Sequence, residues 1–128
     1  MEFRAAEPSD FDEIRRFLAA NGWEKRVGDR ERFLRMMENA SRTVVAVEDD
    51  RIVGFARALC DDASNGYIGT VLVAEEMRGR GIGREIINRL TGDDPGITWV
   101  LRAGHGSEAF WKKLGFEASE AAMERRRR

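Results

Sequence analysis

The stretch that decides the fold is Met77-Arg78-Gly79-Arg80-Gly81-Ile82-Gly83-Arg84. An apolar, β-branched run, Val71–Val73, precedes it. Apolar residues at helical spacing follow it, from Ile82 to Leu90. This pattern predicts a strand that enters a glycine-rich turn, which in turn opens a helix.

The glycines and arginines of this turn predict a bound anion. Three glycines within five residues each cost about 0.5–1 kcal/mol in chain entropy relative to alanine, and we expect no packing reason for them. Arg78, Arg80 and Arg84 crowd a helix N-terminus, whose dipole disfavours cations. A phosphate would turn both features into binding groups, because free N–H groups, the dipole and guanidinium groups all suit it. A solvated, flexible turn is the alternative.

Composition bounds the class of protein. With 128 residues, 42% hydrophobic and 35% charged, we expect one domain spanning residues 1–128. The net charge of -1 provides no overall basic field for nucleic acid or an anionic membrane. No apolar run approaches the roughly 20 residues of a membrane span. The single cysteine, Cys60, cannot form an internal disulfide, and the expected compartment is the cytoplasm.

Periodicity and turn residues predict the other elements. In chain order we expect an edge strand at Glu2–Ala5, a helix from the N-cap Ser9 to Asn21 that Gly22 stops, a helix at Asp29–Asn39, a hairpin of Thr43–Glu48 and Arg51–Leu59, a strand at Tyr67–Val73, a helix from Gly81 to Thr91, a strand at Ile97–Arg102, a helix at Ser107–Leu114, and a final strand or hairpin from Phe116 with Met123 inward. The strand-helix-strand segment predicts a parallel pair with a right-handed crossover. The phosphate would then lie at the carboxyl end of the first of these strands.

Two motifs resemble the signatures of the GNAT superfamily of acyl-CoA-dependent N-acetyltransferases. The segment 78–83 fits the R/Q-x-x-G-x-G/A signature, and Phe110-Trp111-Lys112-Lys113-Leu114-Gly115-Phe116 is similar to F-Y-x-K-x-G-F. The resemblance implies an α/β fold with a mostly antiparallel sheet, one parallel strand pair splayed around acetyl-CoA, and about four flanking helices. It also implies direct transfer of acetyl from acetyl-CoA to an amine, without a metal or a covalent enzyme intermediate.

The resemblance further implies where the cofactor binds. Its pyrophosphate would contact the backbone amides from Arg78 to Arg84. Its pantetheine arm would pair with the strand before the turn, at Val71–Val73. A backbone N–H of Leu72 or Val73 would face the thioester oxygen. The expected cofactor-binding residues are Val71, Leu72, Val73, Arg78, Gly79, Arg80, Gly81, Ile82, Gly83, Arg84, Trp111 and Lys113.

The chain departs from the family pattern at the positions expected to transfer protons during catalysis. Trp111 replaces the usual tyrosine, and because indole has no proton with a relevant pKa, the general-acid role does not transfer to it. Tyr67, the only tyrosine, is the catalytic candidate. It would orient a water or donate to the thiolate, with packing across the sheet as the alternative. Asp61 and Asp62 would attract a cationic amine or take its proton through water, unless they are only solvated loop residues. His105 would reach the cofactor or be simply exposed.

Two other functions remain open at this stage. Trp111, together with Gly104 in place of a common asparagine, is compatible with an acyl-CoA-binding regulatory module whose catalysis is weak or lost. The Arg125–Arg128 tail would serve a protein or nucleic-acid binder, although a net-negative chain does not favour nucleic acid. The expected partner is a small-molecule or peptide amine, and not a membrane. Because little chain follows Phe116, we expect an acceptor site that is open or completed by a second subunit, which favours a homodimer.

Overall fold

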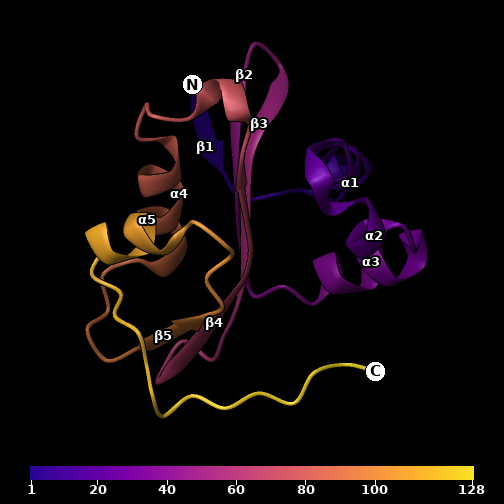
Figure 1. Ribbon diagram of the computed structural model, residues 1–128. Helices are drawn as coiled ribbons and strands as arrows, with labels where there is room; N and C mark the ends of the chain where they lie inside the picture. The colour runs from indigo at the N-terminus through magenta and orange to yellow at the C-terminus, as the bar shows by residue number, and fades with distance from the viewer.

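The computed structural model describes residues 1–128 and has a five-stranded sheet at its centre (Figure 1). The strands are β1 (Glu2–Arg4), β2 (Arg42–Glu48), β3 (Arg51–Cys60), β4 (Asn65–Val73) and β5 (Thr98–Leu101). They lie in the order β1-β2-β3-β4-β5, and every neighbouring pair is antiparallel except β4 and β5, which are parallel. The expected α/β fold with a mostly antiparallel sheet and one parallel pair is therefore confirmed.

Helices cover both faces of the sheet. They are α1 (Phe11–Leu18), α2 (Glu24–Val27), α3 (Arg30–Glu38), α4 (Ile82–Thr91) and α5 (Glu108–Lys113). Figure 1 shows α1 to α3 on one face and α4 and α5 on the other. Each face has its own buried cluster, because successive strand residues point to opposite faces: Phe55 belongs to the cluster under α1–α3 and Ala56 to the cluster under α4. None of the helices combines the length and the apolar character that crossing a membrane requires.

The first helix begins later than predicted, and its predicted stop at Gly22 is a break within a longer helical segment. Ser9 is not its N-cap, because Pro8–Asp10 forms a 3-10 turn and α1 begins at Phe11. The Asp10 carboxylate accepts the N–H of Glu7 at 2.7 Å and is held by Arg4 at 2.7 and 3.0 Å. An ionised carboxylate accepts more strongly than a serine hydroxyl. Gly22, at φ 95°, does break the helix, but α2 follows directly.

The prediction for the C-terminal segment is wrong. No strand follows Phe116, and Met123 is 97% exposed and not inward. The segment after Phe116 has a single large apolar side chain to bury, which is too little to hold a strand against the sheet. It runs from the side of α5 past β5 toward the face of α1–α3 (Figure 1). Glu124 ties it to the end of β5 by an ion pair with Arg102 at 2.9 Å.

The parallel pair separates partway along its length. β5 pairs with β4 only from Asn65 to Ile68, whereas β4 continues to Val73 along β3. Gly69 is the extra residue of a β-bulge at this point, because the register with β3 shifts from Thr70 to Ile68. A bulge bends the strand and increases its local twist. The two strands consequently diverge beyond Ile68.

Candidate functional site

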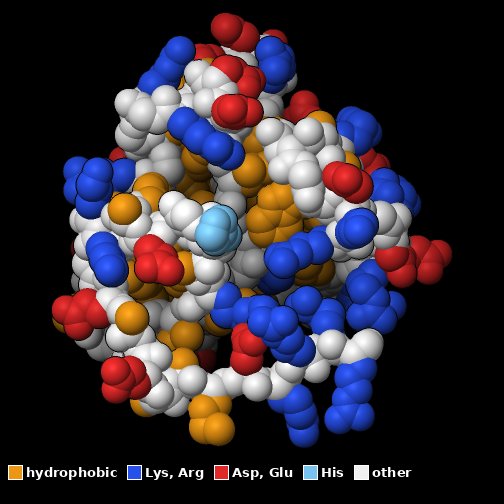
Figure 2. Space-filling model, viewed as in Figure 1, with side chains coloured by type: hydrophobic (Ala, Val, Ile, Leu, Met, Phe, Trp, Pro, Cys, Tyr) orange, Lys and Arg blue, Asp and Glu red, His pale blue; other side chains and the backbone are white.

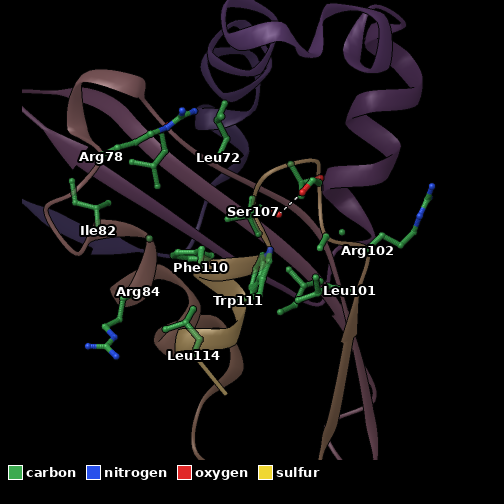
Figure 3. Close-up of a pocket in the computed structure, with 18 of the residues that line it drawn as sticks. Leu72, Arg78, Ile82, Arg84, Leu101, Arg102, Ser107, Phe110, Trp111 and Leu114 are labelled. Carbon is green, nitrogen blue, oxygen red and sulfur yellow. Dashed lines mark hydrogen bonds between the residues drawn. The ribbon is translucent and has the colours of Figure 1, made fainter. Parts of the chain in front are cut away.

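A cleft of about 1180 Å³ opens where β4 and β5 diverge. Figure 2 shows the hollow, with apolar side chains inside and lysine and arginine side chains gathered along its lower rim. Its walls are β4, the glycine-rich turn with the start of α4, the loop after β5, and α5. Figure 3 shows Phe110 and Trp111 of α5, with Leu114 just after it, along one side, and Leu72 and Arg78 across from them.

The start of α4 leaves its backbone donors without a side-chain cap. Gly81 occupies the N-cap position at φ 79°, and Gly79 before it has φ 81°. Both are left-handed conformations, which glycine adopts without steric penalty. Nothing lies within 4 Å of a Cβ built at either position, so conformation and not crowding requires these glycines. The first intrahelical bond runs from Glu85 N–H to the Gly81 carbonyl at 3.1 Å. The residues whose N–H groups come before it, Ile82, Gly83 and Arg84, line the cleft.

Gly83 is required by close packing, because it contacts a residue of the second motif. A Cβ at Gly83 would lie 3.0 Å from Cε1 and 3.1 Å from Cζ of Phe110. The Phe110 ring packs edge-on to Trp111, with centroids 5.0 Å apart, and Trp111 packs edge-on to Phe116 at 5.3 Å. Trp111 is only 8% exposed. The expectation that packing explains none of the three glycines is therefore wrong for Gly83.

The three arginines of the turn lie in different places. Arg78 lines the cleft, and its Nε donates to the Val73 carbonyl at 3.2 Å. Arg84 also lines the cleft and extends outward at one end of it (Figure 3). Arg80 does not line this cleft, because its side chain lies at a separate shallow hollow beside Glu48 and Glu85.

The remaining predicted residues converge on the cleft. The side of β4 that faces away from β3 has no partner strand from Gly69 to Val73, so its backbone groups are available to a bound chain. Tyr67 is half-buried on the same strand. Apart from Arg80, every residue expected at the site lines the cleft: Tyr67, Val71, Leu72, Val73, Arg78, Gly79, Gly81, Ile82, Gly83, Arg84, Trp111 and Lys113.

The acidic residues considered for the acceptor lie elsewhere. Asp61 accepts the N–H groups of Ala63, Ser64 and Asn65 at 2.9, 2.7 and 3.0 Å. The Ser64 hydroxyl and these backbone bonds hold the pKa of the Asp61 carboxyl well below its usual range, which makes it a weaker base. Asp62 pairs with Arg42 at 2.8 Å. No aspartate, glutamate or histidine lines the cleft, and no three potential metal ligands lie close enough to hold an ion.

Several cleft residues were missed by the sequence reasoning. Arg26, Arg102 and Arg126 belong to no motif, and only the tertiary structure brings them to the cleft. Ser107 also lines it, with its hydroxyl donating to the Gly104 carbonyl at 2.7 Å. Arg57 does not line the cleft, but it contacts Gly69 and Thr70, which do. A signal was available for it, because a charged residue within an apolar strand is rarely without a role.

Comparison with known proteins agrees with this geometry. The family model described as an acetyltransferase (GNAT) domain matches residues 39–118. Three solved structures resemble the chain. A GNAT-family protein from Xanthomonas campestris has a TM-score of 0.81 and 22% identity, with 98% of this chain and 94% of that chain covered. A GNAT-family acetyltransferase from Streptococcus pneumoniae (TM-score 0.75, 16% identity) and an acetyltransferase from Trypanosoma brucei (TM-score 0.71, 25% identity) each match with 98% of both chains covered. These likenesses concern the fold. No curated protein matches the chain.

Proposed function

Because the chain belongs to the GNAT acetyltransferase family, we propose that it transfers acetyl from acetyl-CoA directly to an amine, with both substrates bound together. One observation carries this proposal: the uncapped first turn of α4 and the unpaired side of β4 face the same cleft. The first suits a phosphate group. The second suits an extended chain with amide groups, such as a pantetheine arm. A cofactor that has both parts fits this arrangement.

The proposal assigns the cleft residues to parts of acetyl-CoA. The first-turn N–H groups of α4 would bind the pyrophosphate, with Arg78, Arg84 and Lys113 supplying positive charge at that end. Val71–Val73 would pair with the pantetheine arm. The N–H of Leu72 or Val73 would donate to the thioester oxygen, where negative charge develops during transfer. Because Arg80 faces another hollow, only its backbone is available to the cofactor.

The transfer step needs an amine that has lost its proton. The amine nitrogen forms a bond to the acetyl carbon, the carbon–sulfur bond breaks, and the thiolate that leaves takes up one proton while the amine gives up one. No carboxylate or imidazole lines the cleft to accept that proton, so water is its acceptor. Tyr67 would orient this water or donate to the thiolate. Trp111, buried between two aromatic rings, would shape the wall beside the thiol.

Binding tests the cofactor site. We expect isothermal titration calorimetry to show acetyl-CoA binding that Gly81→Glu abolishes, because a carboxylate would enter the space of the phosphates. Arg84→Ala should weaken binding by about tenfold, since a charge-assisted hydrogen bond contributes about 1.5–3 kcal/mol and part of it is screened by solvent. Arg80→Ala is the matched control and should change affinity by less than about twofold. Equal losses for Arg80→Ala and Arg84→Ala would show that the cleft assignment is wrong.

Turnover tests the reaction. Release of free thiol from acetyl-CoA should depend on an added amine, and a panel of amino acids, peptides, polyamines and aminoglycosides covers the main classes. Tight acetyl-CoA binding with no thiol release for any amine would instead support an acyl-CoA-binding regulatory module. Trp111 and the absence of a base in the cleft are the features that make this second candidate worth testing.

A further inference from the structure

The charges that line the cleft are unbalanced. Six cationic side chains line it and no acidic one does: Arg26, Arg78, Arg84, Arg102, Lys113 and Arg126. The phosphates of the proposed cofactor would neutralise those near the start of α4 and on α5. The remaining three come from α2, the end of β5 and the C-terminal segment, and Arg102 and Arg84 extend outward at opposite ends of the site (Figure 3). Glu124 offsets two of these three, through bonds of 2.9 Å to Arg102 and to Arg126, and Arg26 has no acidic partner.

Arg57 adds a further uncompensated charge beside the cleft, although it does not line the cleft itself. It is half-buried on β3, on the face of the sheet that α1–α3 cover. Its Nε donates to the Thr70 hydroxyl at 3.0 Å. A Cβ at Gly69 would lie 2.8 Å from the Arg57 Cζ, so the guanidinium lies flat against the bulge where β4 and β5 diverge.

No acidic group compensates Arg57. It forms no ion pair, and its two terminal nitrogens donate no hydrogen bond within the protein. The ionisable groups close enough to act on it are Tyr67 and Arg127, neither of them a carboxylate, and burial lowers the pKa of its guanidinium. An unpaired, partly desolvated charge is unfavourable in the free protein. A carboxylate of a bound molecule would remove that penalty and accept both terminal nitrogens in a bidentate arrangement.

The lack of a base in the cleft restricts the amine itself. A lysine side chain has an unperturbed pKa of about 10.4, whereas a peptide α-amine has one of about 7.7–8.0. At neutral pH the neutral, reactive form is therefore about several-hundredfold more abundant for the α-amine than for the lysine amine. Neighbouring positive charge lowers the amine pKa further. The same charge repels polyamines and other polycations.

From these observations we propose that the acceptor is the α-amine of an acidic peptide, and that Arg57 is the specificity-determining residue that binds the carboxylate beside that amine. This inference rests on the proposed transfer to an amine and names the class of amine. Gly69 and Thr70, which both contact Arg57, line the cleft on the side of the acceptor. Arg26 and Arg126 at the rim would attract the anionic peptide. The attraction of these rim residues is screened by salt.

The first experiment compares three tripeptide amides that differ only in the first side chain: Glu-Ala-Ala, Gln-Ala-Ala and Lys-Ala-Ala. Glutamate and glutamine have nearly the same shape, so their ratio isolates the charge. We expect kcat/KM for the glutamate peptide to exceed that for the glutamine peptide by about 10- to 100-fold, the range for a charged hydrogen bond. The lysine peptide should be slower than the glutamine peptide. Raising the salt concentration should reduce the glutamate preference.

The second experiment removes Arg57. In Arg57→Gln the ratio of the glutamate to the glutamine peptide should fall to about one. Arg57→Lys should retain only part of the preference, because lysine lacks the planar fork. Arg51→Gln is the matched control, an exposed arginine at the start of the same strand, and should leave the ratio unchanged. Circular dichroism would report whether each variant is folded. If Arg57→Gln does not fold, the peptide series on the unaltered protein decides alone.

The outcomes separate the two proposals. Equal rates for the glutamate and glutamine peptides, or faster transfer to the lysine peptide or a polyamine, would overturn the acidic-peptide acceptor and leave the proposed function standing. An unchanged glutamate preference in a folded Arg57→Gln variant would overturn the role of Arg57. Thiol release from no amine at all would overturn the proposed function itself.

Discussion

Alanine substitutions at two glycines of one turn should destabilise the protein for different reasons. At Gly81, φ is 79° and the space around a Cβ is empty. Gly81→Ala should therefore cost only the left-handed conformation, about 1–2 kcal/mol. Gly83 is the second residue of α4, where alanine gains about 0.8–1.0 kcal/mol in helix propensity. Its Cβ would press on Phe110 at 3.0 Å, and overpacking costs about 1–3 kcal/mol. We expect a net loss of about 0–2 kcal/mol for Gly83→Ala.

The Phe110→Leu background distinguishes these two causes. Leucine lacks the ring atoms Cε1 and Cζ that the new methyl group would meet. In this background Gly83→Ala should become stabilising, by up to about 1 kcal/mol, whereas Gly81→Ala should cost as much as before. Urea unfolding followed by circular dichroism gives the four free energies of each double-mutant cycle. If Gly83→Ala has the same effect in both backgrounds, the contact between the two motifs does not explain this glycine.

Three other changes follow from the same packing and charge arguments. Trp111→Ala should lower the free energy of unfolding by about 3–5 kcal/mol, because it opens a cavity between two aromatic rings; thermal unfolding measures this, and a loss below about 1 kcal/mol would contradict its role in packing. Asp10→Ala should cost about 1–2 kcal/mol at neutral pH, since it removes the bonds to Arg4 and a turn cap. The Arg4 guanidinium lowers the pKa of Asp10 in the folded state, so this stabilisation is present above the ordinary value of 3.8 and is lost as pH falls through the lower folded value. Unfolding free energies of the protein and of Asp10→Ala should therefore converge in acid, and a constant difference would contradict the linkage. Gly66→Ala should lower the free energy of unfolding by about 1–3 kcal/mol, because its Cβ would lie 2.3 Å from the Trp99 ring where β4 pairs with β5. In the Trp99→Leu background, Gly66→Ala should change the urea midpoint of unfolding much less.

The sequence predicted the fold well for those elements whose conformation depends on residues close together in the sequence. The strand that ends at Val73, the glycine turn and α4 are such a case, because β-branched runs, left-handed glycines and helical spacing are all short-range features. The α3 helix is another, with Asp29 as its N-cap accepting the N–H of Arg32 at 3.1 Å. Helices α3 and α4 lie within one residue of their predicted bounds, and β4 begins two residues before its predicted start.

Long-range packing and competition between caps were not predictable in this way. Ser9 suits an N-cap, but it lies within the 3-10 turn Pro8–Asp10 that precedes α1, and Arg4 reaches the last residue of this turn, Asp10, from β1. The contact between Gly83 and Phe110 joins α4 to α5, and nothing in the spacing of the motifs indicates that their side chains touch. The final strand or hairpin expected from Phe116 is absent, because the segment has only one large apolar side chain, Met123, and that side chain is exposed.

The same limit applied to the site. A sequence motif predicts the course of the backbone, but the direction of each side chain depends on the geometry of the turn. Arg78, Arg80 and Arg84 looked equivalent in the sequence, yet Arg80 lies at a different hollow from the other two. Arg26 reaches the cleft from α2, and nothing in the sequence distinguishes it from the other arginines of this chain. Arg126 belongs to the Arg125–Arg128 tail, but the sequence did not indicate that the tail reaches the cleft.

Two departures from the family pattern have one consequence for the chemistry. Trp111 provides no proton for the thiolate, and the cleft has no carboxylate or imidazole to take one from the amine. In the proposed reaction both transfers would then involve solvent, so the rate would depend on how much of the acceptor amine is already neutral. The pH profile of kcat/KM should therefore follow the pKa of the amine and shift when the peptide amine is exchanged for a more basic one. A profile that is the same for amines of different basicity would point to a titrating group of the protein, with Tyr67 as the residue to examine first.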